Sequence, residues 1–248
     1  MFTYPLIKHL HEETKNPMGI PADEKDWPES WKTVEFKEYP RMPQIVLPNP
    51  DLLSTPFGTV LEKRRSRKNF DSNVSLSLRE LSTLLHFSAG ISRNKETPER
   101  SFRFYPSGGG LYPLEIYLSL KKSDEIDSGI YHYNVRKHSL EKIHNEKGAE
   151  MLWNMPTYPW VKDAAALVFI TAIFNRNMQK YRERGYRFIH IEAGALFYNF
   201  YLVSEAYGLG CCGVGATGYI DDIVCKTLDL DTDTESMISL QTIGRLRA

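Results

Sequence analysis

Alternating apolar and polar residues mark strands in the middle of the chain. Residues 114–120 (LEIYLSL) alternate with a period of two and predict a strand. Residues 129–134 (GIYHYN) and 138–143 (HSLEKI) flank a short polar turn and predict a hairpin. Residues 164–174 (AAALVFITAIF) are apolar almost throughout, which predicts a strand buried on both faces. Together these segments predict a central sheet.

Two helices are predicted before the strands. Residues 57–63 (FGTVLEK) predict a helix that runs into a basic loop. Ser77 and Glu80 have the spacing of a capping box, in which each side chain accepts a hydrogen bond from the other residue's backbone N–H. This pattern predicts a helix through LSTLLHFSA that ends at Gly90.

A long helix and two shorter elements are predicted after the strands. Residues 187–207 are apolar nearly all the way round, which is typical of a helix buried in a domain or at a subunit interface. Residues 219–228 predict a short helix and residues 236–244 a strand. The chain is therefore predicted to have an α+β fold.

The chain before residue 57 has no sustained periodicity and contains many Pro and Trp residues. Repeated prolines prevent a continuous helix, since each removes a backbone donor. We expect residues 1–56 to be an extension that wraps over one domain of residues 57–248, held by Trp27, Trp31 and Phe36. A disordered linker is the alternative.

Composition excludes some classes of partner. The chain of 248 residues has 31 basic and 31 acidic side chains, so no net charge favours nucleic acid or an anionic membrane. Its apolar stretches are too short for a signal peptide or a membrane span, which predicts a cytoplasmic protein. Cys211, Cys212 and Cys225 lack the spacing of a zinc or disulfide framework and are expected to be small buried residues. No histidine cluster predicts a metal site.

Residues 63–68 (KRRSRK) contain five cations in six residues. Guanidinium and ammonium groups with an interspersed hydroxyl are well suited to holding a phosphate group. A solvated basic face and a nucleic-acid patch are the alternatives, and the zero net charge weakens the latter.

Two glycine-rich segments are candidate cradles for a flat ring or an anion. Pro106-Ser107-Gly108-Gly109-Gly110 precedes the strand at 114–120, and Gly213-Val214-Gly215 follows the long helix. Without a Cβ, a glycine backbone can lie directly against a ligand. A simple flexible turn is an equal alternative, because no dinucleotide or P-loop signature is present.

Lys180 and Tyr181 are the candidate catalytic residues. A lysine beside a tyrosine can act as a general base and proton relay if burial or a nearby cation adjusts the pKa of either group. An ordinary charged helix face is the alternative interpretation.

Taken in order, these motifs resemble the flavin-dependent nitroreductase superfamily. Residues 64–70 (RRSRKNF), 106–113 (PSGGGLYP), the long helix and Gly244-Arg245 match its elements in the family's order. Residues 11–15 (HEETK), the Trp- and Pro-rich extension and Lys180-Tyr181 resemble the SagB-type branch, whose members oxidise azoline rings. The resemblance covers nearly the whole chain, although Ala195 and Tyr198 stand where the family often has His and Gln.

The resemblance implies a homodimer with FMN at the subunit interface and a central mixed or antiparallel sheet flanked by helices. By this resemblance, the phosphate and ribityl chain of FMN are held by Arg64, Arg65, Ser66, Lys68 and Arg245. The residues implied to line the isoalloxazine are Pro106, Ser107, Gly108, Gly109, Gly213, Val214 and Gly215. Asn199 is retained as a further cofactor residue, and Lys180 and Tyr181 are implied to be catalytic.

The implied reaction is the oxidation of a thiazoline or oxazoline ring to a thiazole or oxazole in a peptide or a carrier-bound chain. Tyr181 would accept the Cα proton, with Lys180 lowering the pKa of Tyr181 or relaying the proton. One alternative is an NAD(P)H-dependent reductase of nitroaromatics or quinones. Another is a flavin-binding scaffold subunit of a synthetase complex, which would include a cyclodehydratase.

Overall fold

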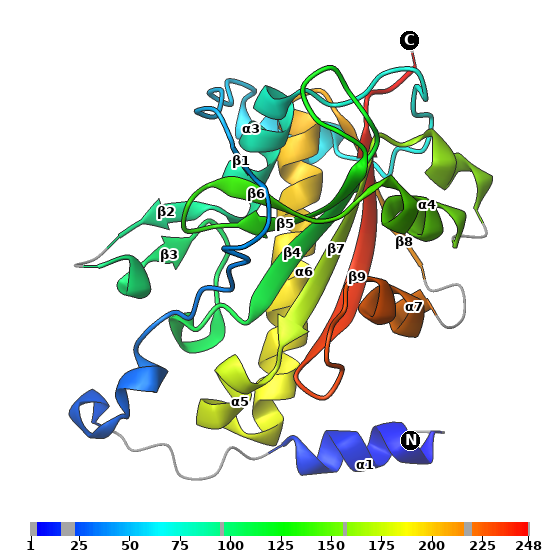
Figure 1. The fold of residues 1–248 in the computed structure, drawn as a ribbon. Helices are drawn as coiled ribbons and strands as arrows, with labels where there is room; N and C mark the ends of the chain where they lie inside the picture. The colour runs from blue at the N-terminus through cyan, green and yellow to red at the C-terminus, as the bar shows by residue number, and fades with distance from the viewer. Residues whose placement is uncertain (1–3, 16–22, 95–96, 156–157, 216–219, 248) are drawn as a thin grey trace.

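A seven-stranded sheet forms the centre of the computed structural model (Figure 1). Its strands, in spatial order, are β1 (Gln44–Val46), β6 (Ser139–His144), β5 (Gly129–Asn134), β4 (Leu114–Leu120), β7 (Ala166–Ile173), β9 (Glu235–Gly244) and β8 (Gly210–Val214). Every pairing among them is antiparallel, and so is that of β2 (Ile91–Arg93) with β3 (Phe102–Arg103) in a second small sheet. The structure describes residues 4–15, 23–94, 97–155, 158–215 and 220–247.

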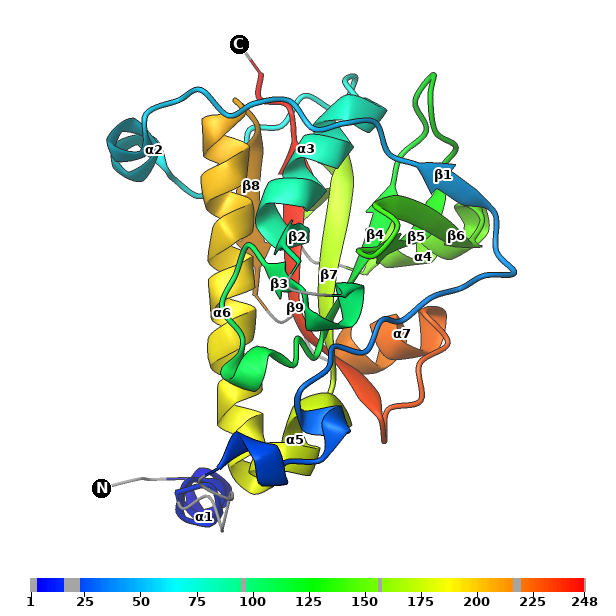
Figure 2. The same ribbon diagram turned by 90° about the vertical axis from the view of Figure 1, so that its left-hand side faces the viewer.

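Helices cover both faces of the large sheet. The α-helices of the described residues are α1 (Pro5–Glu13), α2 (Phe57–Lys63), α3 (Leu78–Ala89), α4 (Glu146–Asn154), α5 (Asn175–Tyr181), α6 (Glu183–Ala206) and α7 (Ile220–Thr227). α3 and α6 pack on one face, and α4 and α7 lie on the other (Figures 1 and 2). Along β4, Ile116 and Leu118 face the core on the α6 side, whereas Tyr117 joins the core on the α7 side. The predicted α+β fold is confirmed.

The predicted strands and first two helices are found with small shifts at their ends. The strand at 114–120 and the hairpin of β5 and β6 are confirmed, as are β7 and β9. Both hydrogen bonds of the capping box at the start of α3 are present, from Glu80 N to Ser77 Oγ (3.2 Å) and from Ser77 N to Glu80 Oε2 (2.8 Å). Tyr219, the predicted first residue of the α7 helix, lies outside the described residues.

The long helix differs from its prediction at its start. α6 begins at Glu183 rather than at Arg187, directly after Arg182, whose φ of +48° separates it from α5. One side of α6 is buried, but Ile191 is 70% exposed on its other side. The helix is therefore apolar on nearly all sides because one face of α6 is buried and its opposite face carries exposed apolar side chains such as Ile191.

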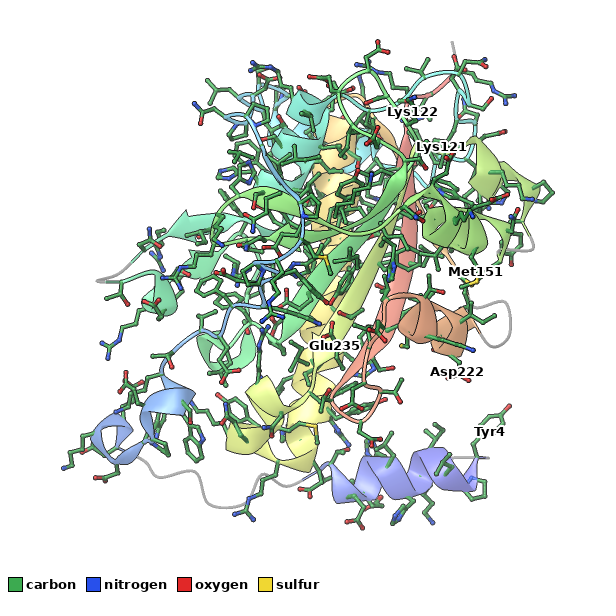
Figure 3. All side chains as sticks on the ribbon, in the orientation of Figure 1. Tyr4, Lys121, Lys122, Met151, Asp222 and Glu235 are labelled. Carbon is green, nitrogen blue, oxygen red and sulfur yellow. The ribbon has the colours of Figure 1, made fainter. Side chains whose placement is uncertain are left out.

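The described part of the extension packs against the domain. From α5 it runs along the molecule to β1, which pairs with β6 as an edge strand, and then crosses to α2 (Figure 2). Val34 and Leu47 are buried in the core on the α6 side. Lys37 Nζ lies 2.5 Å from Glu235 Oε2. Glu235 is the first residue of β9 (Figure 3). Residues 1–3 and 16–22 of the extension are outside the described residues.

All three cysteines are free and buried, as predicted. In the described parts of the chain, no helix is long and apolar enough to cross a membrane. Within the same residues, no three His, Cys, Asp or Glu side chains are grouped so that they could hold a metal ion.

Candidate active site

The basic segment meets α6 and β8 around one tyrosine. The guanidinium carbon of Arg64 lies 5.4 Å from the centroid of the Tyr201 ring, and Ser66 Oγ lies 3.3 Å from the Tyr201 hydroxyl. The backbone N–H of Gly213 donates a hydrogen bond to the same hydroxyl (2.7 Å). Two predicted phosphate residues and one predicted ring residue are therefore brought together by Tyr201.

Other cations of the segment point in different directions. Arg65 donates to the backbone carbonyls of Glu62 and Arg64, each at 2.8 Å. Lys68 Nζ lies 5.1 Å from the centroid of the Trp160 ring. Arg67, which was not predicted as a cofactor residue, pairs with Glu205 of α6 at 3.1 Å. This ion pair anchors the segment to the helix.

Arg245 lies next to the basic segment, because Phe70 and Leu246 form a β-bridge between the two. Its guanidinium pairs with Glu80 at 2.5 Å and is 52% exposed. Among the described residues, no carboxylate lies within 4.0 Å of the cationic atoms of the other predicted phosphate-binding cations, which are Arg64, Arg65 and Lys68. These three cations can therefore compensate the charge of an anion.

The triglycine segment forms a tight 3₁₀ turn, Gly108–Gly110, between the small sheet and β4. Gly109 and Gly110 have φ values of +72° and +68°, which L side chains rarely adopt. Ser107 Oγ accepts a hydrogen bond from Tyr112 N (2.9 Å) and donates one to Glu192 of α6 (2.7 Å). The turn is thus held by its own serine on the central helix.

α5 brings the candidate catalytic residues to this turn. Asn177 Nδ2 donates to Gly108 O (3.1 Å). A Cβ on Gly109 would lie 2.6 Å from the Tyr181 hydroxyl, which is too close for a carbon atom. Only glycine therefore leaves room for the Tyr181 hydroxyl at this position. The structure therefore places Tyr181 directly against the predicted ring-binding turn.

Lys180 is enclosed beside Tyr181. It is 3% exposed, and its Nζ lies 3.5 Å from the centroid of the Trp27 ring and 5.4 Å from that of Tyr181. Burial lowers the pKa of Lys180, opposed by nearby Glu24, while burial raises the pKa of Tyr181. Two roles were expected for Lys180, lowering the pKa of Tyr181 or relaying its proton. Because the pKa of Tyr181 is raised, the relay of the proton is the role that matches this environment better.

Glu192 is a further titratable group under the triglycine turn. It is 2% exposed, and its Oε1 has no hydrogen-bond partner among the described residues. Burial raises the pKa of Glu192 to about 8, although the hydrogen bond from Ser107 opposes this shift. Burial therefore favours the neutral, protonated form of this carboxyl group beneath the turn.

Replacing Glu192 with glutamine is expected to change the pH dependence of stability. Between pH 4.5 and about 8 the folded state keeps a proton that the unfolded state has lost, so the free energy of unfolding falls as pH rises. The full shift corresponds to about 5 kcal/mol of stability that is lost as pH rises, and glutamine removes this dependence. Urea unfolding of the FMN-free protein at pH 5 and pH 8 measures the slope, with exposed Glu183→Gln as the control. Equal slopes in Glu192→Gln and the natural sequence contradict the prediction.

The remaining predicted residues lie around these two regions. Asn199 Nδ2 donates to Ser88 O (3.1 Å), which joins α6 to α3 rather than to the Tyr201 cluster. Val214 ends β8, and Gly215 follows it in an exposed position. Pro106 is exposed at the start of the turn.

Sequence reasoning missed four residues of the site. Glu192 had a signal, because it is a lone carboxylate among apolar residues of a helix. The sequence gives no signal for Asn177, for Tyr201 or for the contact of Trp27 with Lys180. Amides and aromatic residues are common, and these residues contact segments that are distant in sequence.

The two regions fit a cofactor that has a phosphate at one end and a flat ring at the other. Arg64, one of the three uncompensated cations, lies near Tyr201, and the glycine turn lies near Glu192, nine residues or about 14 Å along the same helix. Near the turn, Asn177 Oδ1 and Glu192 Oε1 are buried without hydrogen-bond partners among the described residues. Gly110 has open space where a Cβ would stand, so its backbone is accessible to a ring.

The antiparallel sheet between two helical layers, with a cationic segment and a glycine turn on one central helix, defines the nitroreductase class of fold. The chain belongs to the nitroreductase family, whose model matches residues 61–245. The family suggests an oxidoreductase, and its members typically bind FMN.

Three relatives are at least 30% identical to the chain. A nitroreductase-like protein of Methanocaldococcus jannaschii is 33% identical over 79% of this chain and 94% of its own. The microcin B17-processing protein McbC of Escherichia coli is 32% identical over 74% of this chain and 67% of its own. The trifolitoxin-processing protein TfxB of Rhizobium leguminosarum is 30% identical over 68% of this chain and 48% of its own.

Solved structures share the fold. A nitroreductase-like protein of Anabaena variabilis superposes with a TM-score of 0.77 at 24% identity, covering 99% of this chain and 49% of its own. A chain of the E. coli microcin synthetase McbBCD complex with truncated pro-MccB17 bound gives a TM-score of 0.61 at 22% identity, covering 98% of this chain and 92% of its own. A Desulfovibrio desulfuricans structure in complex with FMN gives 0.52 at 16% identity, covering 79% of this chain and 88% of its own.

Proposed function

We propose that the protein is an FMN-dependent dehydrogenase that oxidises a thiazoline or oxazoline ring to the aromatic azole. The observation that carries this proposal is the Tyr181 hydroxyl against Gly109, beside the buried amine of Lys180. An azoline loses a proton from Cα and a hydride from the adjacent ring carbon, so the reaction needs a proton acceptor beside a hydride acceptor. The likeness to two peptide-processing proteins, McbC and TfxB, supports a peptide substrate.

The cofactor proposed is FMN. Arg64, Ser66 and Lys68 would hold its phosphate, with Arg65 and Arg245 nearby. The backbone of the triglycine turn and of residues 213–215 would contact its ring. Bound FMN would accept the hydride and pass the electron pair to oxygen.

The chain's own residues would move the proton. A tyrosine hydroxyl is ordinarily protonated at neutral pH, and burial raises the pKa of Tyr181 further. In the relay, the Tyr181 oxygen takes the Cα proton while its own proton passes to the amine of Lys180, which must be neutral to accept it. Burial lowers the pKa of Lys180, which favours that neutral amine.

The test is direct turnover. The FMN-loaded protein is mixed with a synthetic peptide that contains one thiazoline, and products are followed by mass spectrometry. We expect loss of two hydrogen atoms per ring, with one molecule of oxygen consumed for each azole formed. Rapid bleaching of FMN by NAD(P)H without azole formation would instead establish a nitro or quinone reductase.

We further propose a homodimer that works with a cyclodehydratase in a synthetase complex. The likeness to a chain of the McbBCD complex and the exposed apolar side of α6 support such assembly. A protein truncated at Thr55 discriminates the scaffold alternative. Lost assembly with intact azole formation would assign the extension to docking.

A further inference from the structure

His132 of β5 is a fully buried histidine that lies between two carboxylates. Its Nε2 lies 3.0 Å from Glu115 Oε2, and its Nδ1 lies 2.9 Å from Glu141 Oε2. An ionised carboxylate only accepts hydrogen bonds, whereas a neutral imidazole has a single N–H to donate. Both contacts are therefore hydrogen bonds only when the His132 ring carries two protons and a positive charge.

The pKa shifts of the three groups agree with this charged state. Burial alone would raise the pKa of Glu115 and of Glu141, but their hydrogen bonds and charged neighbours lower both below the usual value. Burial alone would lower the pKa of His132, but its hydrogen bonds to Glu115 and Glu141 raise it. These shifts favour an imidazolium between two carboxylates.

Glu115 connects the imidazolium to α5. The second oxygen of Glu115, Oε1, lies 2.5 Å from Nη1 of the buried Arg176. Arg176 is one turn before Lys180 and Tyr181 on the same short helix. The position of both candidate catalytic residues therefore depends on this chain of charges.

Glu141 connects the imidazolium to the extension. The backbone N–H of Tyr39 donates to Glu141 Oε2 (2.9 Å), and the Tyr39 ring lies edge-on to the His132 ring at 5.1 Å. Earlier in the extension, the ring centroid of Trp27 lies 3.5 Å from Lys180 Nζ. One side of His132 thus holds the helix that carries Lys180, and the other holds the segment that covers it.

Other charged and titratable groups pack around this cluster from the extension, the sheet and α5. Lys37 Nζ donates to the Tyr117 hydroxyl (2.7 Å), and the Tyr117 ring centroid lies 5.1 Å from that of His132. The groups that face the cluster are Glu35, Lys37 and Tyr39 of the extension, Tyr117 of β4, Glu235 of β9 and Arg176 of α5.

Stability alone is a weak reason for such a network. Taking charges out of water costs about as much free energy as their mutual attraction returns, so apolar residues often serve a core equally well. Charged hydrogen bonds instead give a fixed geometry. Here they fix the two segments that enclose Lys180.

We propose that His132 is a positioning residue, whose imidazolium holds Lys180 and Tyr181 in place by tying α5 and the extension to one point of the sheet. The proposal deepens the proposed azoline oxidation and rests on it. His132 acts through Arg176 and Tyr39 and takes no part in the proton relay. Loss of its second proton leaves a single N–H for two carboxylates and so releases one of the two segments.

His132→Gln tests the proposal, because glutamine keeps hydrogen-bonding groups but removes the positive charge. Hydrogen exchange of the FMN-loaded protein is followed by mass spectrometry in peptides that contain residues 35–39 and 175–181. We expect exchange in both segments to rise about tenfold, since each opens more easily. At pH 7, kcat for the thiazoline peptide should fall about 10- to 10²-fold, with KM within about threefold, because misplaced groups slow the chemical step.

His138→Gln is the matched control. Both ring nitrogens of His138 are also hydrogen-bonded, each at 2.8 Å, but their partners are the hydroxyls of Ser82 and Tyr133. Burial lowers the pKa of His138 to about 4, which favours a neutral ring. This variant should leave kcat, KM and the exchange of both segments unchanged.

The pH profile of the natural protein is a test that does not depend on the folding of a variant. We expect kcat to fall above the pH at which nitrogen NMR shows that the His132 ring loses its second proton. Titration of Lys180 acts in the opposite direction, because the relay needs its neutral amine. The alkaline fall should persist in His138→Gln and be absent from His132→Gln.

Two results overturn the proposal outright. One is a His132 ring with a single proton at pH 7, and the other is a folded His132→Gln protein with unchanged exchange and kcat. Loss of kcat without a rise in exchange also overturns it, since His132 would then act by a route other than these segments. A natural protein that forms no azole, but whose two segments open in His132→Gln, refutes the proposed function and leaves the positioning of Lys180 and Tyr181 standing.

Discussion

Tyr181→Phe is expected to lower kcat for azole formation by about 10²- to 10⁴-fold, the usual contribution of a positioned proton-transfer group. The hydroxyl is lost, but the phenyl ring keeps its edge-to-face contact with Phe188 at 5.0 Å. FMN should therefore stay bound, and the protein should remain yellow. Stopped-flow reduction of FMN by a thiazoline peptide measures the effect on the proton-coupled step.

Tyr186→Phe is the matched control for this substitution. Tyr186 lies on α6 and stacks on Phe174 at 6.0 Å, so its ring position is equally defined. Its variant should turn over normally. Undiminished turnover in Tyr181→Phe would remove Tyr181 from the mechanism and leave Lys180 as the only candidate of the pair.

Glu115→Gln is expected to destabilise the protein by about 3–5 kcal/mol, the usual result of removing one partner from a buried ion pair. Arg176 of α5 lies 2.5 Å from Glu115, and both side chains are 5% to 6% exposed. The other Glu115 oxygen lies 3.0 Å from His132, which is itself 2.9 Å from Glu141. The substitution leaves the guanidinium of Arg176 without its buried counter-charge.

The same ion pair predicts a loss of stability in acid. Burial alone would raise the pKa of Glu115. The opposing effects of Arg176 and His132 are larger together and lower this pKa to about 2. Its contribution is present above pH 4.5 and is lost as pH falls toward 2. Urea unfolding at pH 7 and pH 3 measures both effects. Asp127→Asn, at a pair whose carboxylate is 77% exposed, should change stability by less than about 1 kcal/mol.

An equal loss of stability in Glu115→Gln and Asp127→Asn would contradict the role of the buried ion pair.

The same ion pair also affects function through α5, because Arg176 is one turn before Lys180 and next to Asn177, which holds the glycine turn. We expect Glu115→Gln to lower kcat as well. A variant with full activity would show that α5 does not depend on this anchor.

The sequence predicted best those elements whose signals are local. The capping box at Ser77 and Glu80 and the alternation in β4 depend on neighbouring residues, and both appear as expected. β1, β2 and β3 were missed because each has two or three residues, and such strands are defined by their partners. The break between α5 and α6 was also missed, since it rests on the backbone of Arg182, which has no sequence signature.

The candidate site shows the same division. Family-like motifs pointed to Ser66, Gly109 and Tyr181, but not to the contact of Ser66 with Tyr201 or of Gly109 with Tyr181. The hydrogen bond of Gly213 with Tyr201 and the position of Trp27 on Lys180 join segments far apart in the chain. Only the folded topology brings these residues together, so no single-sequence pattern could predict them.

The position of β9 between β7 and β8 affects how the protein is made. A nascent chain that has emerged only as far as β8 holds β7 with one edge unpaired, and β8 has no partner until residues 235–244 leave the ribosome. The free edge of β7 is apolar, which makes it a template for pairing with other chains. Slow translation between β8 and β9 should therefore favour aggregation, and a holding chaperone that covers β7 should favour yield.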